Sequence, residues 1–148
     1  MAEQAHEQIR VEASPGRCYE VAIDFERYPD WAKDVKQATV VARDGEGRGD
    51  KVEYRVAGLG KSIHYTLQYD FGDAPASFSW RLLEGDMLRK LDGTYRFEAD
   101  GDATLVSYDL VIDLSAPLPG LIKRRATGKI MGTALRELKK EIERRAAT

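Results

Sequence analysis

The chain has 148 residues, of which 43% are hydrophobic and 32% charged, a composition typical of a folded domain and not of a disordered segment. Its length predicts a single domain over residues 1–148. The net charge of −2 argues against a general nucleic-acid binder, and one cysteine excludes an internal disulfide and a cysteine-based metal site.

The first elements along the chain are a strand and two short helices. Alternating apolar and polar residues predict a half-buried strand at about His6–Ala13. Ser14 before Pro15 is typical of a helix start, because Ser can cap free N–H groups and Pro has no N–H to satisfy. We expect a short helix over about Pro15–Asp24 and a second short helix or turn from Phe25 to Trp31.

The pattern from Val35 to Leu114 is almost entirely that of strands separated by short turns rich in Gly and Asp. Such turns join antiparallel neighbours, because parallel strands need much longer crossovers. Together with the first strand, this meander predicts an antiparallel sheet of about seven strands. The predicted strands are about Val35–Arg43, Lys51–Ala57, Ser62–Phe71, Ser77–Leu83, Leu88–Ala99 and Ala103–Leu114.

A long helix is predicted at about Gly120–Arg145, after the break Pro117-Leu118-Pro119-Gly120. Its apolar residues recur at three- and four-residue spacing, so one side should lie on the sheet. Arg124 precedes Met131 by seven positions and falls on this side. Its guanidinium could pair with a ligand oxygen, or it could reach water at a cavity mouth with its stem on apolar surface. The apolar side comprises Thr127, Met131, Ala134, Leu135, Leu138 and Ile142.

The alternation within the strands assigns apolar side chains to one face of the sheet, and several of them are tyrosines. A buried tyrosine hydroxyl needs a hydrogen-bond partner, which a ligand or water in a cavity can supply. Alternatively, the tyrosines lie at strand ends with their hydroxyls in solvent. The predicted ligand-lining residues are Tyr54, Tyr65, Leu67, Tyr69, Trp80, Tyr95 and Tyr108 of the sheet and Met131 and Leu135 of the helix.

Positive charge is concentrated in the last helix. Nine Lys/Arg and three Glu lie between Leu121 and Arg145, a local net charge of +6 that leaves −8 for the rest of the chain. The triplet Lys123, Arg124 and Arg125 adjoins apolar residues such as Leu121, which predicts a peripheral contact with an anionic membrane. The alternative is an ordinary solvated helix start.

Side chains typical of catalysis or metal binding are sparse. His6 lies near the terminus and His64 on the predicted wet face, without metal-ligand spacing, and Cys18 is expected to pack within the first helix. Gly58-Leu59-Gly60-Lys61 lacks the spacing of a phosphate loop and predicts a hairpin turn. We therefore predict no metal, no cofactor and no catalytic residue. The polar start of the chain and the lack of a stretch of ~18 apolar residues predict a cytoplasmic protein.

Three segments of the chain are distinctive: Val21–Trp31 with its Tyr28-Pro29-Asp30-Trp31 turn, the predicted hairpin containing Leu91–Phe97 and Thr104–Tyr108, and the Pro-Leu-Pro-Gly break. These segments resemble the START-like, or helix-grip (SRPBCC), superfamily, and most of all its polyketide cyclase/coenzyme Q-binding group. The resemblance implies an α+β fold. A curved antiparallel sheet of about seven strands would wrap around the C-terminal helix, with two short helices after the first strand.

The resemblance also implies a cavity between sheet and helix that holds an apolar or aromatic small molecule, such as a lipid, an isoprenoid quinone or a polyketide. Trp31 would lie near its mouth and face inward, or would only staple the short helices to the sheet. Aromatase/cyclases and protein-interaction domains of the superfamily supply two alternative functions. Ser79 and Arg81 fall on the face opposite Trp80, so no catalytic motif is matched unless a bulge shifts the register.

Overall fold

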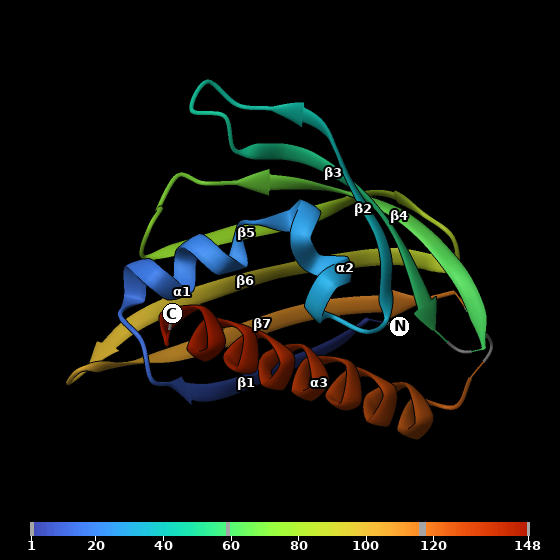
Figure 1. Ribbon diagram of the computed structural model, residues 1–148. Coiled ribbons are helices and arrows are strands. Elements are labelled where there is room, and N and C mark those ends of the chain that lie inside the picture. Colours follow the sequence, from blue (N-terminus) through green and yellow to red (C-terminus); the bar gives the residue numbers. More distant parts are fainter. Residues whose placement is uncertain (1, 59, 116–117, 148) are drawn as a thin grey trace.

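The computed structural model describes residues 2–58, 60–115 and 118–147, in which a seven-stranded antiparallel sheet curves around a long helix (Figure 1). The strand order is β1-β7-β6-β5-β4-β3-β2, so each of β2 to β6 pairs with the next strand along the chain and β1 pairs with β7. This arrangement confirms the predicted α+β helix-grip fold. The elements are β1 (Glu3–Val11), α1 (Pro15–Ala22), η1 (Phe25–Arg27), α2 (Tyr28–Trp31), β2 (Val35–Arg43), β3 (Gly49–Gly58), β4 (Lys61–Asp70), β5 (Ser77–Gly85), β6 (Leu88–Asp100), β7 (Ala103–Leu114) and α3 (Gly120–Ala146).

The ends of the first elements differ from the sequence-based expectation. Strand β1 begins at Glu3 because its pairing with β7 continues as far as the Glu3–Ile112 pair, which polar residues at the chain start did not reveal. Helix α1 begins where expected, with the Ser14 side chain accepting a hydrogen bond from the Arg17 N–H. It ends at Ala22, two residues early, and a single 3-10 turn leads into α2.

The predicted hairpin turn at residues 58–61 and the predicted break at residues 117–120 each include positions outside the described residues. On either side of them, β3 pairs with β4 and α3 follows β7 as expected. The predicted division between an apolar and a polar sheet face is confirmed, because the core is formed from the apolar set. Strand β5 keeps Arg81 exposed, opposite Gln68, so the register irregularity between Thr66 and Leu67 does not turn it inward.

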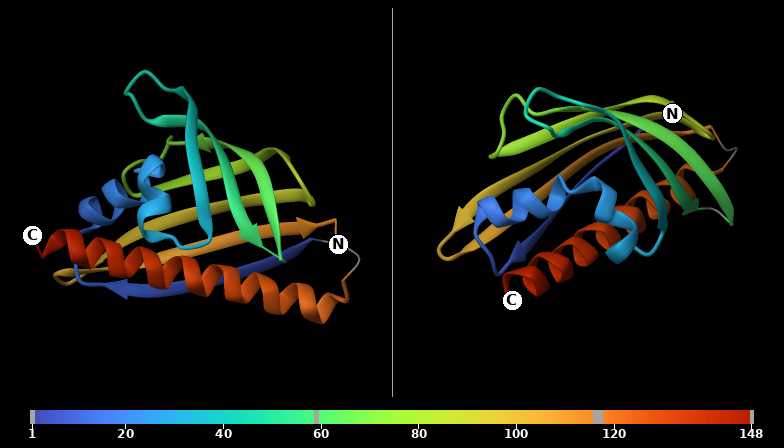
Figure 2. Two further views of the ribbon diagram at one scale, coloured as in Figure 1. Left: turned by 45° about the vertical axis from the view of Figure 1, so that its right-hand side comes forward. Right: turned by 45° about the horizontal axis from the view of Figure 1, so that its top comes forward.

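Helix α3 lies under one side of the curved sheet, and Figure 2 shows the sheet arching over it. The helix packs mainly along β1 and β7 and against α1 and α2. Its residues Thr127, Met131, Leu135, Leu138 and Ile142 are at most 2% exposed, which confirms the predicted apolar side. Strands β3 to β6 lie farther from α3 than β1 and β7 do, on the other side of the curved sheet. The space between these strands and the helix is therefore filled by large side chains.

Candidate functional site

The inner face of the sheet is closed at one end and half open at the other. At the end covered by α1, Phe25, Phe78 and Phe97 are at most 4% exposed. At the opposite end, five apolar side chains on the inner face of β3 to β6 are only partly buried, although Ile63 of β4, which pairs with Val56, is 6% exposed. We call this region the half-open end; its residues are Val56, Tyr65, Leu82, Leu88 and Leu91. Strand β7 also ends on this side, at Leu114, because neighbouring antiparallel strands run in opposite directions. Helix α3 follows β7 along the chain, so it begins at the half-open end.

Aromatic rings line the interior between the two ends. Tyr95 stacks on Tyr108 with ring centroids 4.6 Å apart, and Trp80 lies 5.4 Å from Tyr95 and 5.8 Å from Tyr108. Tyr69 connects this cluster to the half-open end, because its ring lies 6.0 Å from that of Trp80 and its hydroxyl lies 2.8 Å from that of Tyr54. The Tyr54 ring in turn lies 5.3 Å from that of Tyr65. The structure thus brings the predicted tyrosines and Trp80 onto one continuous surface, with Leu67 buried among the same core residues.

The tyrosine hydroxyls fall into two groups. The first group has protein partners. The hydroxyls of Tyr54 and Tyr69 form a hydrogen bond with each other at 2.8 Å, and the Tyr28 hydroxyl donates to the Ala22 carbonyl at 2.5 Å. The hydroxyls of Tyr65, Tyr95 and Tyr108 form no hydrogen bond with any residue that the structure describes. Tyr95 and Tyr108 are only 8% and 7% exposed as whole residues, yet none of these three hydroxyl oxygens is fully buried, so each keeps a small contact with solvent.

Burial controls the protonation of these phenols. Loss of solvation raises the pKa of Tyr54, Tyr69, Tyr95 and Tyr108 well above the usual value, and that of Tyr65 is raised by the same cause. They are therefore neutral O–H groups over the whole physiological range. Such groups can donate a hydrogen bond to an oxygen or nitrogen of a bound molecule.

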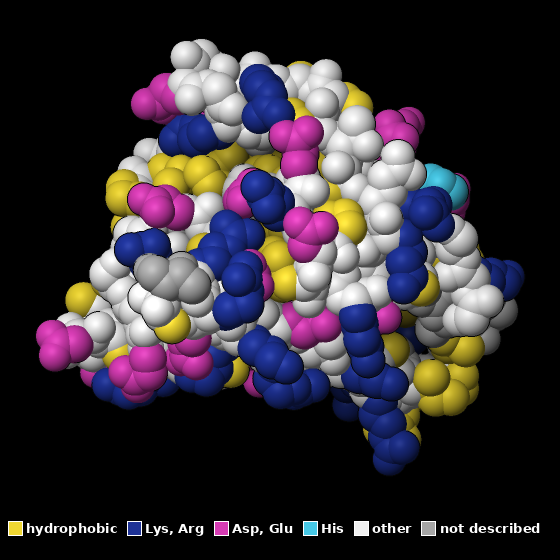
Figure 3. All heavy atoms as spheres, viewed as in Figure 1, with side chains coloured by type: hydrophobic (Ala, Val, Ile, Leu, Met, Phe, Trp, Pro, Cys, Tyr) yellow, Lys and Arg dark blue, Asp and Glu magenta, His cyan; other side chains and the backbone are white. Residues whose placement is uncertain are grey.

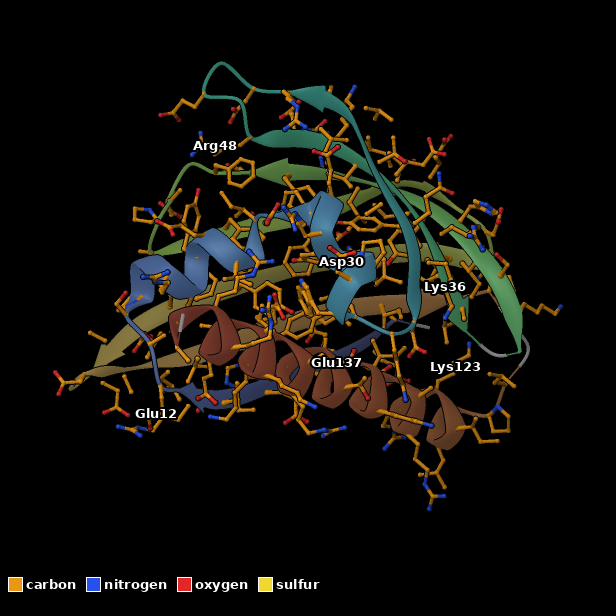
Figure 4. All side chains as sticks on the ribbon, in the orientation of Figure 1. Glu12, Asp30, Lys36, Arg48, Lys123 and Glu137 are labelled. Atoms are coloured by element: carbon orange, nitrogen blue, oxygen red, sulfur yellow. The ribbon has the colours of Figure 1, made fainter. Side chains whose placement is uncertain are left out.

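Trp31 lies on α2, with its ring 4.8 Å from that of Tyr28. Its indole Nε1 is buried and has no acceptor among the described residues. An indole nitrogen can only donate, and buried donors nearly always have a partner. Trp31 Nε1 therefore differs from the three tyrosine hydroxyls, because it is fully buried as well as unpaired among the described residues. The Trp31 ring also packs on Tyr28, in the way that the staple interpretation expects. Lys33, two residues after α2, donates its backbone N–H to Glu137 Oε2 of α3 at 3.1 Å. Figure 4 labels Glu137 on α3 and Asp30 on α2.

The three side chains of the predicted basic triplet point in different directions. The Lys123 side chain folds back to donate to the Leu114 carbonyl at 3.2 Å and so ties α3 to the end of β7. Arg124 is 71% exposed, with its Nε 3.9 Å from a carboxylate oxygen of Glu3. It thus reaches solvent beyond the sheet and does not lie against the apolar interior, although it falls on the buried side by periodicity. Arg125 is exposed on the outward side of the helix.

Two open hollows, of about 540 and 590 Å³, are bordered by polar side chains of the sheet's outer face. The first is bordered by Gln68, Asp70 and Arg81, and the second by His6 and Asp109, whose Nδ1 and Oδ1 lie 2.7 Å apart. Neither hollow includes a residue of α3, so neither is the predicted ligand space between sheet and helix.

Within the described ranges, no three His, Cys, Asp or Glu side chains are grouped so that they could hold a metal ion. No helix in the described part of the chain is both long and apolar enough to cross a membrane. Cys18 is buried, and burial raises the pKa of its thiol, which favours the predicted packing role.

One residue of the interior was missed by the sequence analysis. Gly93 pairs with Trp80 across β5 and β6, and the Trp80 indole lies so close that a Cβ at position 93 would be 2.3 Å from its Cζ2 atom. The available signal was a glycine in the middle of an otherwise regular strand, which often marks a close approach. Gly93 thus sets how flat the Trp80 ring lies on the sheet.

The amino-acid sequence matches the model of a known protein family over nearly its whole length. The model of the family described as "Polyketide cyclase / dehydrase and lipid transport" matches residues 2–143. No curated protein matches the chain. A solved START superfamily protein from Mycobacterium smegmatis is 23% identical, with a TM-score of 0.89 over 95% of this chain and 97% of that chain.

Two further solved structures are similar over nearly the whole chain. A protein from Thermus thermophilus is 26% identical, with a TM-score of 0.80 and 99% of both chains covered. The Zhui aromatase/cyclase from a Streptomyces species is 18% identical, with a TM-score of 0.82 over 99% of this chain and 96% of that chain. At these identities the structural likeness supports the fold.

Proposed function

Because the chain belongs to the polyketide cyclase/dehydrase and lipid-transport family, we propose that it binds an uncharged apolar small molecule between the sheet and α3. The observation that carries this proposal is the half-open end. Val56, Tyr65, Leu82, Leu88 and Leu91 face the interior from four strands, yet they are only half-buried. Covering such side chains removes apolar surface from water, which favours binding by about 25 cal/mol per Å².

The polar groups of the interior narrow the chemistry of the ligand. Trp31 Nε1 and the hydroxyls of Tyr65, Tyr95 and Tyr108 can all donate a hydrogen bond, and none has a protein partner among the described residues. A carbonyl or ether oxygen on an otherwise apolar molecule would satisfy them. A lipid, an isoprenoid quinone or a polyketide fits this description, and the stacked aromatic rings favour a planar portion. The expected contacts also include Tyr54, Leu67, Tyr69, Trp80, Met131 and Leu135.

An aromatase/cyclase activity is a weaker candidate on the same site. The described inner-face residues of β3 to β7 offer hydroxyl groups but no carboxylate, imidazole or amine. A general base should have a pKa near the working pH, whereas burial raises the pKa of Tyr95 and Tyr108 well above the usual value. These groups are suited to orienting a carbonyl by donating a hydrogen bond and not to removing a proton.

Native mass spectrometry of the purified protein, with solvent extraction of bound molecules, tests the proposal. We expect a molecule with an apolar body and few polar groups to co-purify or to be taken up from an offered panel of lipids, quinones and polyaromatics. Filling the half-open end should abolish this uptake. Leu91→Trp and Val56→Trp place a large ring there, and Leu83→Trp is the matched control because Leu83 is 40% exposed elsewhere on β5.

Loss of at least tenfold in ligand affinity is expected for Leu91→Trp and Val56→Trp, with wild-type affinity for Leu83→Trp. Thermal unfolding of each variant separates a blocked site from a damaged fold. If all three variants bind as the wild type does, or if no apolar molecule binds at all, the proposed site is wrong.

A further inference from the structure

The N-terminal half of α3 presents an unusual surface. Of the five large hydrophobic residues that are exposed in the described structure, three lie on this half: Leu121 at 60%, Ile122 at 48% and Ile130 at 45%. A soluble helix normally turns such residues inward. Here the apolar side is already occupied by Thr127, Met131 and Leu135, so these three are additional to the core-facing set.

Basic side chains share this surface. Residues i and i+4 lie on the same face of a helix, so Leu121, Arg125 and Lys129 form one row, and Ile122 lies beside it. Arg125 and Lys129 are exposed and have no ion pair with any described residue. The helix contains no Asp or Glu before Glu137. Figure 3 shows Lys and Arg side chains gathered over α3, with hydrophobic side chains beside them near its N-terminal end.

We propose that Leu121, Ile122, Arg125 and Lys129, the α3 docking face, bind the surface of a bilayer that contains anionic lipid. The two apolar side chains enter the boundary between headgroups and acyl chains, while the two cations remain at the level of the anionic headgroups. Lys123 and Arg124 are not part of this face, because Lys123 binds the Leu114 carbonyl and Arg124 leans toward Glu3. The proposal goes beyond ligand binding and does not depend on it.

The place of the docking face suggests why it would be useful. It lies at the end of the fold where α3 begins, which is also the half-open end of the inner face. An apolar molecule that moves between a membrane and the interior would cross little water if the protein docks in this orientation. The charge asymmetry favours the same orientation, since the segment from Leu121 to Arg145 carries +6 and the remainder −8.

Co-sedimentation with vesicles tests the proposal on the ligand-extracted protein, so that failure of ligand binding and failure of docking are separate results. Phosphatidylcholine vesicles with and without about a third phosphatidylglycerol are compared. We expect binding only to the anionic vesicles. Arg125→Gln/Lys129→Gln should weaken it by about 25-fold, since each cation contributes about fivefold. Leu121→Ser/Ile122→Ser should weaken it by at least tenfold.

Two matched variants serve as controls. Arg17→Gln/Lys51→Gln removes two exposed cations from α1 and β3, and Val41→Ser removes an exposed apolar residue from β2. Both should sediment like the wild type. Absence of wild-type binding to anionic vesicles, or equal binding by the docking-face and control variants, would overturn the proposal. Dimerisation that Leu121→Ser/Ile122→Ser abolishes, without vesicle binding, would assign the face to a second copy of the chain and also overturn it.

Discussion

Gly93→Ala tests whether the Trp80 ring is held against the sheet as the structure shows. The new methyl carbon would lie 2.3 Å from Trp80 Cζ2, 2.7 Å from Cε2 and 2.9 Å from the Asp109 carbonyl oxygen. Carbon atoms in ordinary contact are about 3.5–4.0 Å apart, so the indole must move by more than about 1 Å. It cannot do so freely, because Tyr95 and Tyr108 lie against it.

The expected cost follows from two opposing effects. Overpacking a tight interior costs about 1–3 kcal/mol. Alanine regains about 0.5–1 kcal/mol, because glycine loses more conformational freedom in a strand. A net loss of about 0.5–2 kcal/mol in unfolding free energy should result, seen as a fall of about 1–8 °C in melting temperature.

Urea unfolding followed by tryptophan fluorescence measures this loss, and a double-mutant cycle assigns it to the contact. In a Trp80→Leu background the indole is absent, so only the entropic gain of alanine and the close approach to the Asp109 carbonyl oxygen remain. Gly93→Ala should then change the unfolding free energy by less than about 1 kcal/mol, giving a coupling of about 1–3 kcal/mol. Gly128→Ala is the control, because a Cβ there meets nothing within 4 Å. In the helix it should stabilise by up to about 1 kcal/mol. An equal cost of Gly93→Ala in both backgrounds would refute the reasoning.

Two further predictions concern buried polar contacts. Hydrogen bonds from Arg144 and Arg145 lower the pKa of Glu141 from 4.5 to about 2, so its contribution to stability is complete above pH 4.5 and is lost as pH falls toward 2. The urea-midpoint difference between wild type and Glu141→Gln should therefore shrink over that interval, and an unchanged difference at its lower end would contradict this assignment. Tyr54→Phe leaves the Tyr69 hydroxyl buried without its partner and should cost about 1–3 kcal/mol. Adding Tyr69→Phe should cost little more, whereas strictly additive losses would show that the two hydroxyls do not bond.

The strand and helix patterns predicted most of the architecture because they are local. A period of two residues places Tyr54, Trp80 and Tyr108 on one face whatever the rest of the chain does. The turns of Gly and Asp then leave an antiparallel meander as the natural arrangement. The residues at which strands begin and end were less predictable. Strand β1, for example, begins at Glu3 because β7 is long enough to pair with it there.

The basic triplet shows where periodicity stops being informative. Arg124 has the spacing of the buried side, but burial also requires a partner surface opposite it, and the structure leaves its side chain 71% exposed. Lys123 and Arg125 are close neighbours in sequence, yet the turn of about 100° between successive helix residues sends one to the Leu114 carbonyl and the other to the outward side.

By itself, the sequence determined which strand side chains share the inner face, because the two-residue repeat of a strand is a property of the local backbone. Only the tertiary structure decided which inward groups are satisfied. The Tyr54 hydroxyl meets Tyr69 at 2.8 Å, whereas Trp31 Nε1 has no acceptor among the described residues. The close packing of the Trp80 ring on Gly93 was likewise decided by the tertiary structure. Such contacts depend on the distance between segments far apart along the chain, which no local pattern encodes.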